Sequence, residues 1–327
     1  MELKKEDGIK ICESYSIGIL KDLKPLKGGL SNYNFELTTN KGNFIIRFSS
    51  KPQDKKELEK IKIQLKAIKF LAENNFDYDL TIPLKNNENE YIGEINKQSF
   101  WIYEKINGKT YDNPEKVDIK QLAQIVAKYH LIMDKMALGD IKSTFYDYGF
   151  IEEGLKEIKN TIRKKKKKNE IDFFVEKNLG HLEEGFKRIS KIDFGKKFII
   201  AHSDWCVFNF IFEKDKIKGL IDFDMFQIAP YIQDIAIAIK EHCVSLDGDW
   251  DKTKINLFFK EYERMRPIEK FDKYHIKDLI IRDSLGGVIN FYFRKKKVDD
   301  NKRLFMLKWF IIPMNKFLED IKKEDYY

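Results

Sequence analysis

Between Ala201 and Ala236, acidic and amide residues interrupt short apolar segments at fixed offsets. His202, Asp204 and Asn209 form the pattern HxDxxxxN, and Asp222 follows within Ile-Asp-Phe-Asp. Charged side chains are costly inside a strand unless they are paired or hydrated. Two strands joined by a turn would bring the HxDxxxxN residues and Asp222 to one edge of a sheet. We expect these side chains to form a functional site there.

These residue types match the needs of phosphoryl transfer from ATP. That reaction uses a carboxylate beside the attacking hydroxyl, oxygen ligands for Mg²⁺, and a cation on the nucleotide phosphates. Asp204 would accept the proton or orient the hydroxyl, and Asn209 and Asp222 would bind Mg²⁺. We expect His202 to brace the loop through hydrogen bonds. The role of Asp224 stays open between a second metal ligand and a polar neighbour.

The rest of the chain predicts an α+β fold with two lobes. Its 327 residues are enough for two separate cores. Residues 1–106 should form a small lobe with an antiparallel sheet and one amphipathic helix at 55–74. Its strands are expected at residues 23–27, 34–38, 44–48, 91–95 and 99–106. Residues 107–327 should form a mainly helical lobe, interrupted by short apolar strands at 198–201, 209–212 and 218–223.

Composition narrows the classes of protein. Apolar residues make up 43% of the chain, which excludes general disorder. The sequence has no signal peptide and no run of 18 apolar residues, so a cytoplasmic location is expected, without a membrane partner. The net charge of +8 is concentrated at 163–168 and 294–297, which we interpret as solvated surface and not as a specific nucleic-acid site. Three cysteines at unrelated spacings predict no structural disulfide.

The motifs resemble those of a family of small-molecule kinases that includes aminoglycoside phosphotransferases, choline kinases and type II homoserine kinases. The family's usual pattern is HGDxxxxN followed by IDF or IDW, and Ser203 stands here in place of the usual glycine. Asp234 in Gln-Asp-Ile-Ala is similar to a later aspartate that supports the catalytic loop. The resemblance covers roughly residues 23–293. It implies a protein-kinase-like fold that binds ATP and Mg²⁺ between a small lobe and a helical lobe.

The resemblance extends to the first lobe. Residues 28–35 and 42–47 are similar to the family's nucleotide-covering hairpin and the strand that follows it. This implies that Arg47 binds the phosphates and that the hairpin contacts the nucleotide through Gly28, Gly29, Ser31 and Asn32.

A second part of the expected nucleotide site lies after the hairpin. In kinases a helix glutamate holds the phosphate-binding cation. Here Gln64 occupies roughly the position where some relatives have that glutamate. Glu57 and Glu59 lie earlier in the helix, and we expect Glu59, ahead of Glu57, to take its role. The segment with Trp101 and Tyr103 resembles the linker between lobes, whose backbone would meet adenine.

The acceptor is a small molecule with a hydroxyl group, and its identity stays open. The order of expectation is homoserine, a sugar, choline or ethanolamine, and an aminoglycoside. The protein would act as a monomer or a homodimer. The alternative is a catalytically silent, kinase-like coat or scaffold protein with the same fold.

Overall fold

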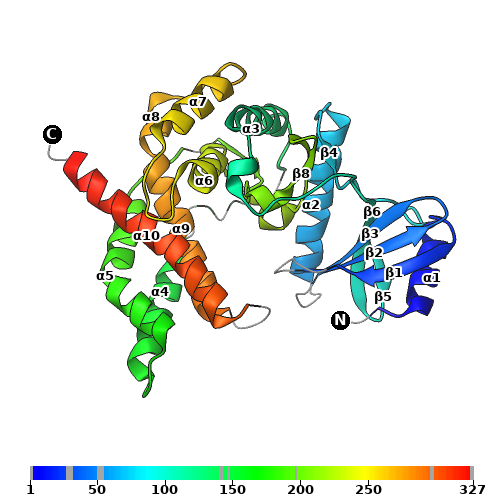
Figure 1. The fold of residues 1–327 in the computed structure, drawn as a ribbon, viewed down its shortest axis with the longest axis horizontal. Helices are drawn as coiled ribbons and strands as arrows, with labels where there is room; N and C mark the ends of the chain where they lie inside the picture. The colour runs from blue at the N-terminus through cyan, green and yellow to red at the C-terminus, as the bar shows by residue number, and fades with distance from the viewer. Residues whose placement is uncertain are drawn as a thin grey trace. The chain divides into compact units, whose positions relative to one another are not determined.

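The computed structural model describes residues 3–26, 32–49, 55–139, 141, 143, 145, 148–195, 197–294 and 298–324. The chain forms two compact units (Figure 1). The first consists of residues 1–111 together with 208–224, and the second of residues 112–207 together with 225–327. The predicted division at 106/107 into a nucleotide-binding and a catalytic lobe is a statement about function, and it stays a prediction.

The first unit contains a five-stranded antiparallel sheet with the order β1-β2-β3-β6-β5. Its strands are β1 (Leu20–Pro25), β2 (Asn32–Thr39), β3 (Asn43–Ser49), β5 (Gly93–Ile95) and β6 (Gln98–Glu104). The helices of this unit are α1 (Lys5–Ser14) and α2 (Lys55–Glu73). The predicted antiparallel sheet with its single long amphipathic helix is therefore confirmed, with the short helix α1 added.

The alternation of side chains along β3 decides what each face of the sheet buries. Ile46 and Phe48 pack in the core that includes residues of α1, whereas Ile45 packs with Ile61 and Leu65 of α2. Successive side chains of a strand point to opposite faces, so Arg47 lies on the α2 face with Ile45. Figure 1 shows α1 and α2 on opposite sides of this sheet.

A second, three-stranded sheet of the first unit combines distant parts of the chain. β8 (Phe210–Glu213) and β9 (Lys216–Leu220) form a hairpin, and β4 (Asp79–Leu80) pairs in parallel with β9. The hairpin turn consists of Lys214 and Asp215, both with positive φ, which suits a two-residue hairpin loop. This pairing joins residues 208–224 to the N-terminal part of the chain.

The second unit is mainly helical, as predicted. Its helices are α3 (Ile119–Met133), α4 (Gly149–Lys164), α5 (Glu170–Ile189), α6 (Ile232–Cys243), α7 (Lys252–Glu263), α8 (Lys270–Tyr274), α9 (Ile276–Phe293) and α10 (Asp300–Glu324). A two-stranded sheet of β7 (Phe198–Ala201) and β10 (Gln227–Pro230) completes it. The apolar helix α9 lies among α4, α5, α6 and α10. A helix with apolar residues on most of its surface is expected to be buried in this way.

In the described part of the chain, three short 3₁₀ helices connect these elements. They are η1 (Pro114–Lys116), η2 (Val207–Asn209) and η3 (Phe223–Met225). The two residues of the predicted metal site lie beside these turns: η2 ends at Asn209, and η3 begins directly after Asp222. Short 3₁₀ turns of this kind serve as connectors at the ends of regular elements.

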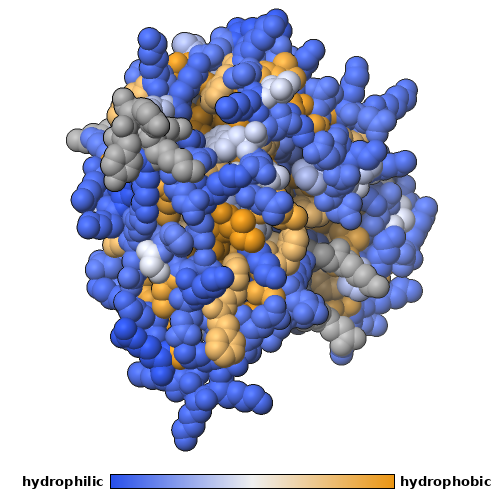
Figure 2. Space-filling view, turned by 60° about the vertical axis from the view of Figure 1, so that its left-hand side comes forward, coloured by the Kyte–Doolittle hydropathy of each residue, from blue (hydrophilic) through white to orange (hydrophobic). Residues whose placement is uncertain are grey.

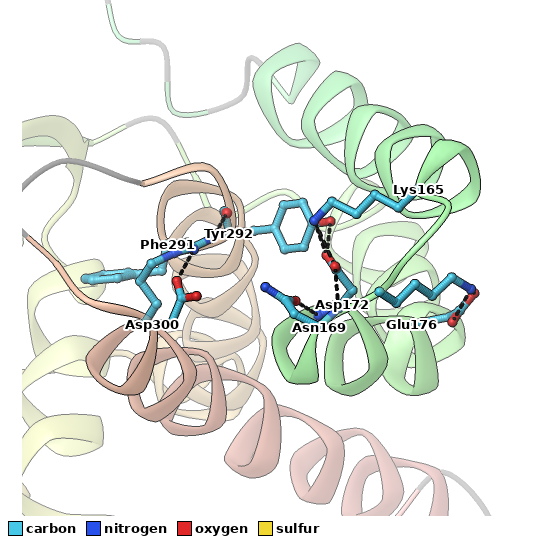
Figure 3. Close-up of polar contacts among 9 residues, drawn as sticks. Lys165, Asn169, Asp172, Glu176, Phe291, Tyr292 and Asp300 are labelled. Carbon is cyan, nitrogen blue, oxygen red and sulfur yellow. Dashed lines mark hydrogen bonds and ion pairs between the residues drawn. The ribbon is translucent and has the colours of Figure 1, made fainter.

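The lysine-rich run at 163–168 lies where α4 leads into α5, and its side chains are mostly exposed. Lys165 Nζ contacts both oxygens of the buried Asp172 at 2.6 and 2.8 Å, and Tyr292 Oη donates to Asp172 at 2.9 Å (Figure 3). Lys168 pairs with Glu176 at 2.7 Å. Part of the positive charge therefore serves to hold this helical hairpin together.

The surface is mostly polar. On the face shown in Figure 2, hydrophilic residues dominate and hydrophobic residues show as separate patches between them. This matches a chain in which 35% of the residues are charged. Among the helices that the structure describes, none combines the length and apolar character needed to cross a lipid bilayer.

Candidate active site

Arg47 lies in the middle of β3, opposite Trp101 of β6, and its side chain is only 9% exposed. Its Nη2 donates to Asp222 Oδ1 at 2.7 Å and to Asp224 Oδ2 at 2.5 Å. Burial by itself lowers the pKa of Arg47, but the charges of Asp224 and Asp222 outweigh that effect and raise the pKa above its usual value. The guanidinium is therefore a permanent cation held by two carboxylates.

The β8–β9 hairpin brings the two predicted metal ligands to one end of the same element. Asn209 precedes β8, and its carbonyl accepts the N–H of Ile221 at 2.9 Å, directly before Asp222. Asp222 has a φ of 63°, a left-handed conformation that aspartate tolerates better than most residues. The hydrogen-bonded ladder therefore places the backbone of Asn209 beside the segment that carries Asp222, at the open end of the hairpin.

Asp224 is surrounded by donors from β2 and α2. Its Oδ2 accepts hydrogen bonds from Arg47 and from the side-chain amide of Asn32, and its Oδ1 accepts one from Gln64 Nε2 at 3.2 Å. Lys60 Nζ donates to its backbone carbonyl at 2.8 Å. Burial raises the pKa of Asp224 above its usual value, while Arg47 opposes that rise.

The structure differs from the prediction that Glu59 holds Arg47. Both ion pairs of Arg47 in the described part of the chain go to Asp222 and Asp224, and Glu59 is exposed on α2. Gln64 is buried and faces the site, and position 59 lies about 140° away from it around a helix with 3.6 residues per turn. The sequence correctly marked Gln64 as unusual, but its pattern did not reveal that an aspartate after β9 supplies the charge.

The second unit carries the loop with His202 and Asp204. Asp234, in the first turn of α6, accepts the backbone N–H of His202 at 3.0 Å and that of Ser203 at 2.7 Å. His130 of α3 lies with its Nε2 3.1 Å from the same carboxylate. This confirms the expected support of the loop by Asp234. Asp204 itself is partly exposed.

The other end of α6 holds the same loop. His242 Nε2 lies 2.7 Å from the carbonyl of Trp205, which fits donation by the ring N–H. Burial lowers the pKa of His242 to about 4, and the hydrogen bond to Trp205 offsets only part of that shift. Burial likewise lowers the pKa of His130, against the effect of Asp234. Burial therefore favours the neutral form of both imidazoles, which serve as hydrogen-bonding supports.

The ring of His202 is buried beside two aromatic rings. Its centroid lies 5.0 Å from that of Trp205 and 6.2 Å from that of Tyr129. A ring packed on these aromatic neighbours fits the predicted bracing role better than contact with a substrate.

Three of the predicted nucleotide-binding residues, Gly28, Gly29 and Ser31, lie outside the described residues. Trp101 and Tyr103 lie in β6 with their side chains buried on the α2 face of the sheet. Burial raises the pKa of Tyr103, although Arg47 acts in the opposite direction. Because both side chains belong to the core, any contact with adenine would be made by the backbone of this strand, as the sequence indicates.

The oxygen atoms near Arg47 suit the binding of a magnesium ion together with a nucleotide. Asp222 is 31% exposed, and no donor from the described residues contacts its Oδ2. The described residues contain no group of three or more His, Cys, Asp or Glu side chains arranged to hold a metal. Mg²⁺ is commonly bound by one or two protein oxygens, with phosphates and water as its other ligands. Asp222 with the amide of Asn209 fits that pattern.

Known proteins are similar to this chain in sequence. Homoserine kinase from Methylobacillus flagellatus is 22% identical over 263 residues, covering 78% of this chain and 74% of that protein. Homoserine kinase from Rhodopseudomonas palustris is 24% identical over 274 residues, covering 82% and 78%.

Solved structures share the fold. A spectinomycin phosphotransferase in complex with ADP and spectinomycin matches with a TM-score of 0.75 at 14% identity, covering 98% of this chain and 99% of that one. A choline kinase from Cryptosporidium parvum matches with a TM-score of 0.61 at 14% identity, covering 98% and 96%. The predicted kinase-like α+β fold is therefore confirmed. A family model described as the phosphotransferase enzyme family matches residues 22–268, and the chain belongs to that family.

Proposed function

We propose that this protein is an ATP- and Mg²⁺-dependent kinase that transfers the γ-phosphate of ATP to a hydroxyl group of a small molecule. The observation that carries the proposal is the pair formed by Arg47 and Asp222, a buried permanent cation 2.7 Å from a partly exposed carboxylate. These are the two charges that a nucleotide triphosphate with its metal ion requires from a protein. The loop that Asp234 supports carries Asp204, which would be the carboxylate beside the attacking hydroxyl.

Each residue has a distinct role in this proposal. Arg47 would bind the nucleotide phosphates, and Asn209 and Asp222 would hold Mg²⁺, which neutralises phosphate charge when bound. Asp204 would take the proton of the acceptor hydroxyl or orient it for in-line attack. The hydroxyl oxygen then forms the new bond to the γ-phosphorus as the bond to the leaving ADP oxygen breaks. Asp234, His130 and His242 would keep the loop rigid.

We propose an amino alcohol of the homoserine type as the first acceptor to test. The support is that the two curated relatives described above are named homoserine kinases, each matching more than three quarters of this chain. A sugar, choline or ethanolamine, and an aminoglycoside are the further candidates, because proteins of this fold act on each of several such classes.

The test is ATP consumption with MgCl₂ across a panel of homoserine, hexoses, choline, ethanolamine and aminoglycosides. We expect one acceptor to stimulate turnover, and Asp204→Asn to lower that turnover by about 10²-fold or more. Asp112→Asn is the matched control, since Asp112 is an exposed aspartate of the same unit. No turnover with any acceptor, together with no Mg²⁺-dependent ATP binding by calorimetry, would reject the enzyme and favour a catalytically silent coat or scaffold protein.

A further inference from the structure

The buried guanidinium of Arg47 needs a fixed negative partner. Removing one member of a buried ion pair leaves an uncompensated charge, which is strongly destabilising. In protein kinases this partner is a glutamate on the helix that packs beside the strand. Here α2 presents the neutral amide of Gln64 at the site, so position 64 supplies a hydrogen-bond donor but no negative charge.

Asp224 supplies a negative charge for Arg47, and its carboxylate is held by hydrogen bonds from several side chains. Both of its carboxylate oxygens accept hydrogen bonds, from Arg47 and Asn32 on one oxygen and from Gln64 on the other. Lys60, one turn before Gln64 on α2, fixes the backbone of the same residue. A glutamate at position 64 would instead place a second carboxylate against Asp224. The amide at 64 and the aspartate at 224 therefore form a complementary pair.

Asp222 differs from Asp224 in how its oxygens are used. Only Oδ1 of Asp222 contacts Arg47, and its side chain is 31% exposed, whereas that of Asp224 is 15% exposed. Of the two acids, Asp222 retains an oxygen for a metal ion, while the oxygens of Asp224 are already occupied by protein donors. Of the two roles that the sequence leaves open for Asp224, these contacts favour a polar neighbour of the site over a second metal ligand.

We propose that Asp224 is a positioning residue that anchors Arg47 in place of the helix glutamate of other kinases. The proposal rests on the proposed function only in assigning Arg47 to the phosphates and Asp222 to the metal. When Asp222 turns to the metal, Arg47 keeps Asp224 as its counter-charge and stays on the α2 face of the sheet. Without Asp224, Arg47 would compete with the metal for Asp222.

Moving the charge from position 224 to position 64 tests this idea. The four chains to compare are the wild type, Asp224→Asn, Gln64→Glu and the double variant. We expect Asp224→Asn to raise the unfolding equilibrium constant by about a hundredfold in the absence of nucleotide. Gln64→Glu alone should also destabilise the protein, through repulsion between two carboxylates. The double variant should recover at least about tenfold of the loss, because the carboxylate introduced on α2 then faces a neutral amide and Arg47.

Ligand binding gives a second measurement. We expect Asp224→Asn to raise the Mg²⁺ concentration for half-maximal ATP binding by about tenfold, and the double variant to reverse most of that change. Glu73→Gln is the control on α2, since Glu73 is 65% exposed and, among the described residues, pairs with Lys69 alone.

Several outcomes would overturn the proposal. If Asp224 were a metal ligand, Asp224→Asn would abolish Mg²⁺-dependent binding and Gln64→Glu would not restore it. A loss of stability on Glu59→Gln, with none on Asp224→Asn, would return the anchor to the helix. A wild-type chain that consumes no ATP would reject the proposed function, and the stability measurements would still decide whether Asp224 anchors Arg47.

Discussion

Ser203 occupies a position that disfavours a serine in two ways. Its φ is 61°, in the left-handed region that glycine adopts freely. Its side chain is buried, and its Oγ makes no hydrogen bond within the described part of the chain. The backbone N–H nevertheless donates to Asp234 at 2.7 Å, so the loop holds this conformation. The left-handed backbone at this position therefore explains why the usual HGD pattern has a glycine there.

Replacing Ser203 by glycine should stabilise the protein. The left-handed conformation costs a non-glycine residue about 1–2 kcal/mol, and a buried hydroxyl without a partner costs about 1–3 kcal/mol. Glycine also gives the unfolded chain a larger conformational entropy, which lowers the free energy of unfolding by about 0.5–1 kcal/mol. We expect Ser203→Gly to raise the free energy of unfolding by about 1–4 kcal/mol. Ser203→Ala removes the hydroxyl but keeps the left-handed backbone, so it should gain less.

Urea denaturation of the wild type, Ser203→Gly and Ser203→Ala measures both contributions, and thermal unfolding should show an increase of about 2–6 °C in Tm for the glycine variant. The difference between the glycine and alanine variants measures the backbone strain minus the entropy cost of glycine, which is about 0.5–1 kcal/mol. If the glycine variant were less stable than the alanine variant by about 0.5–1 kcal/mol, the left-handed conformation would carry no cost in the folded protein, and the reasoning would be wrong.

Two further predictions concern the helical unit. Because burial depresses the pKa of His242 to about 4, only the unfolded chain takes up this proton below pH 6.5, and the free energy of unfolding should fall by an amount on the order of 3 kcal/mol as the pH drops from 6.5 to 4. Denaturant titrations at several pH values should show this loss, and His242→Gln should flatten it; an unchanged pH dependence in that variant would contradict the assignment. Gly287→Ala should cost about 1–3 kcal/mol, because a methyl group there would overlap the ring of Phe310. The matched change Gly286→Ala meets no atom within 4 Å and should be neutral or stabilising by up to about 1 kcal/mol, as measured by thermal unfolding; equal losses in both variants would show that packing against α10 is not the cause.

Local patterns in the sequence were enough to predict the elements and the chemistry. The apolar stripe of 55–74 predicted α2, and turn residues on either side of short apolar segments predicted β2 and β3, because both signals lie in neighbouring residues. The motif with Asp204 and Asn209 predicted the reaction class, since few residue types suit it. The order of the motifs along the chain also predicted the family that the comparisons show.

The tertiary structure alone decided which charges meet. Arg47 pairs with Asp222 and Asp224, which lie 175 and 177 residues further along the chain. The segment that carries both acids packs with the first unit because β9 pairs with β4, a contact that no local period encodes. Glu59 matched the sequence expectation of an acid on α2, but the helix turns it to solvent and brings Gln64 to the site. Ion pairs depend on distances in space, and residues so far apart in sequence become neighbours only when the sheets form.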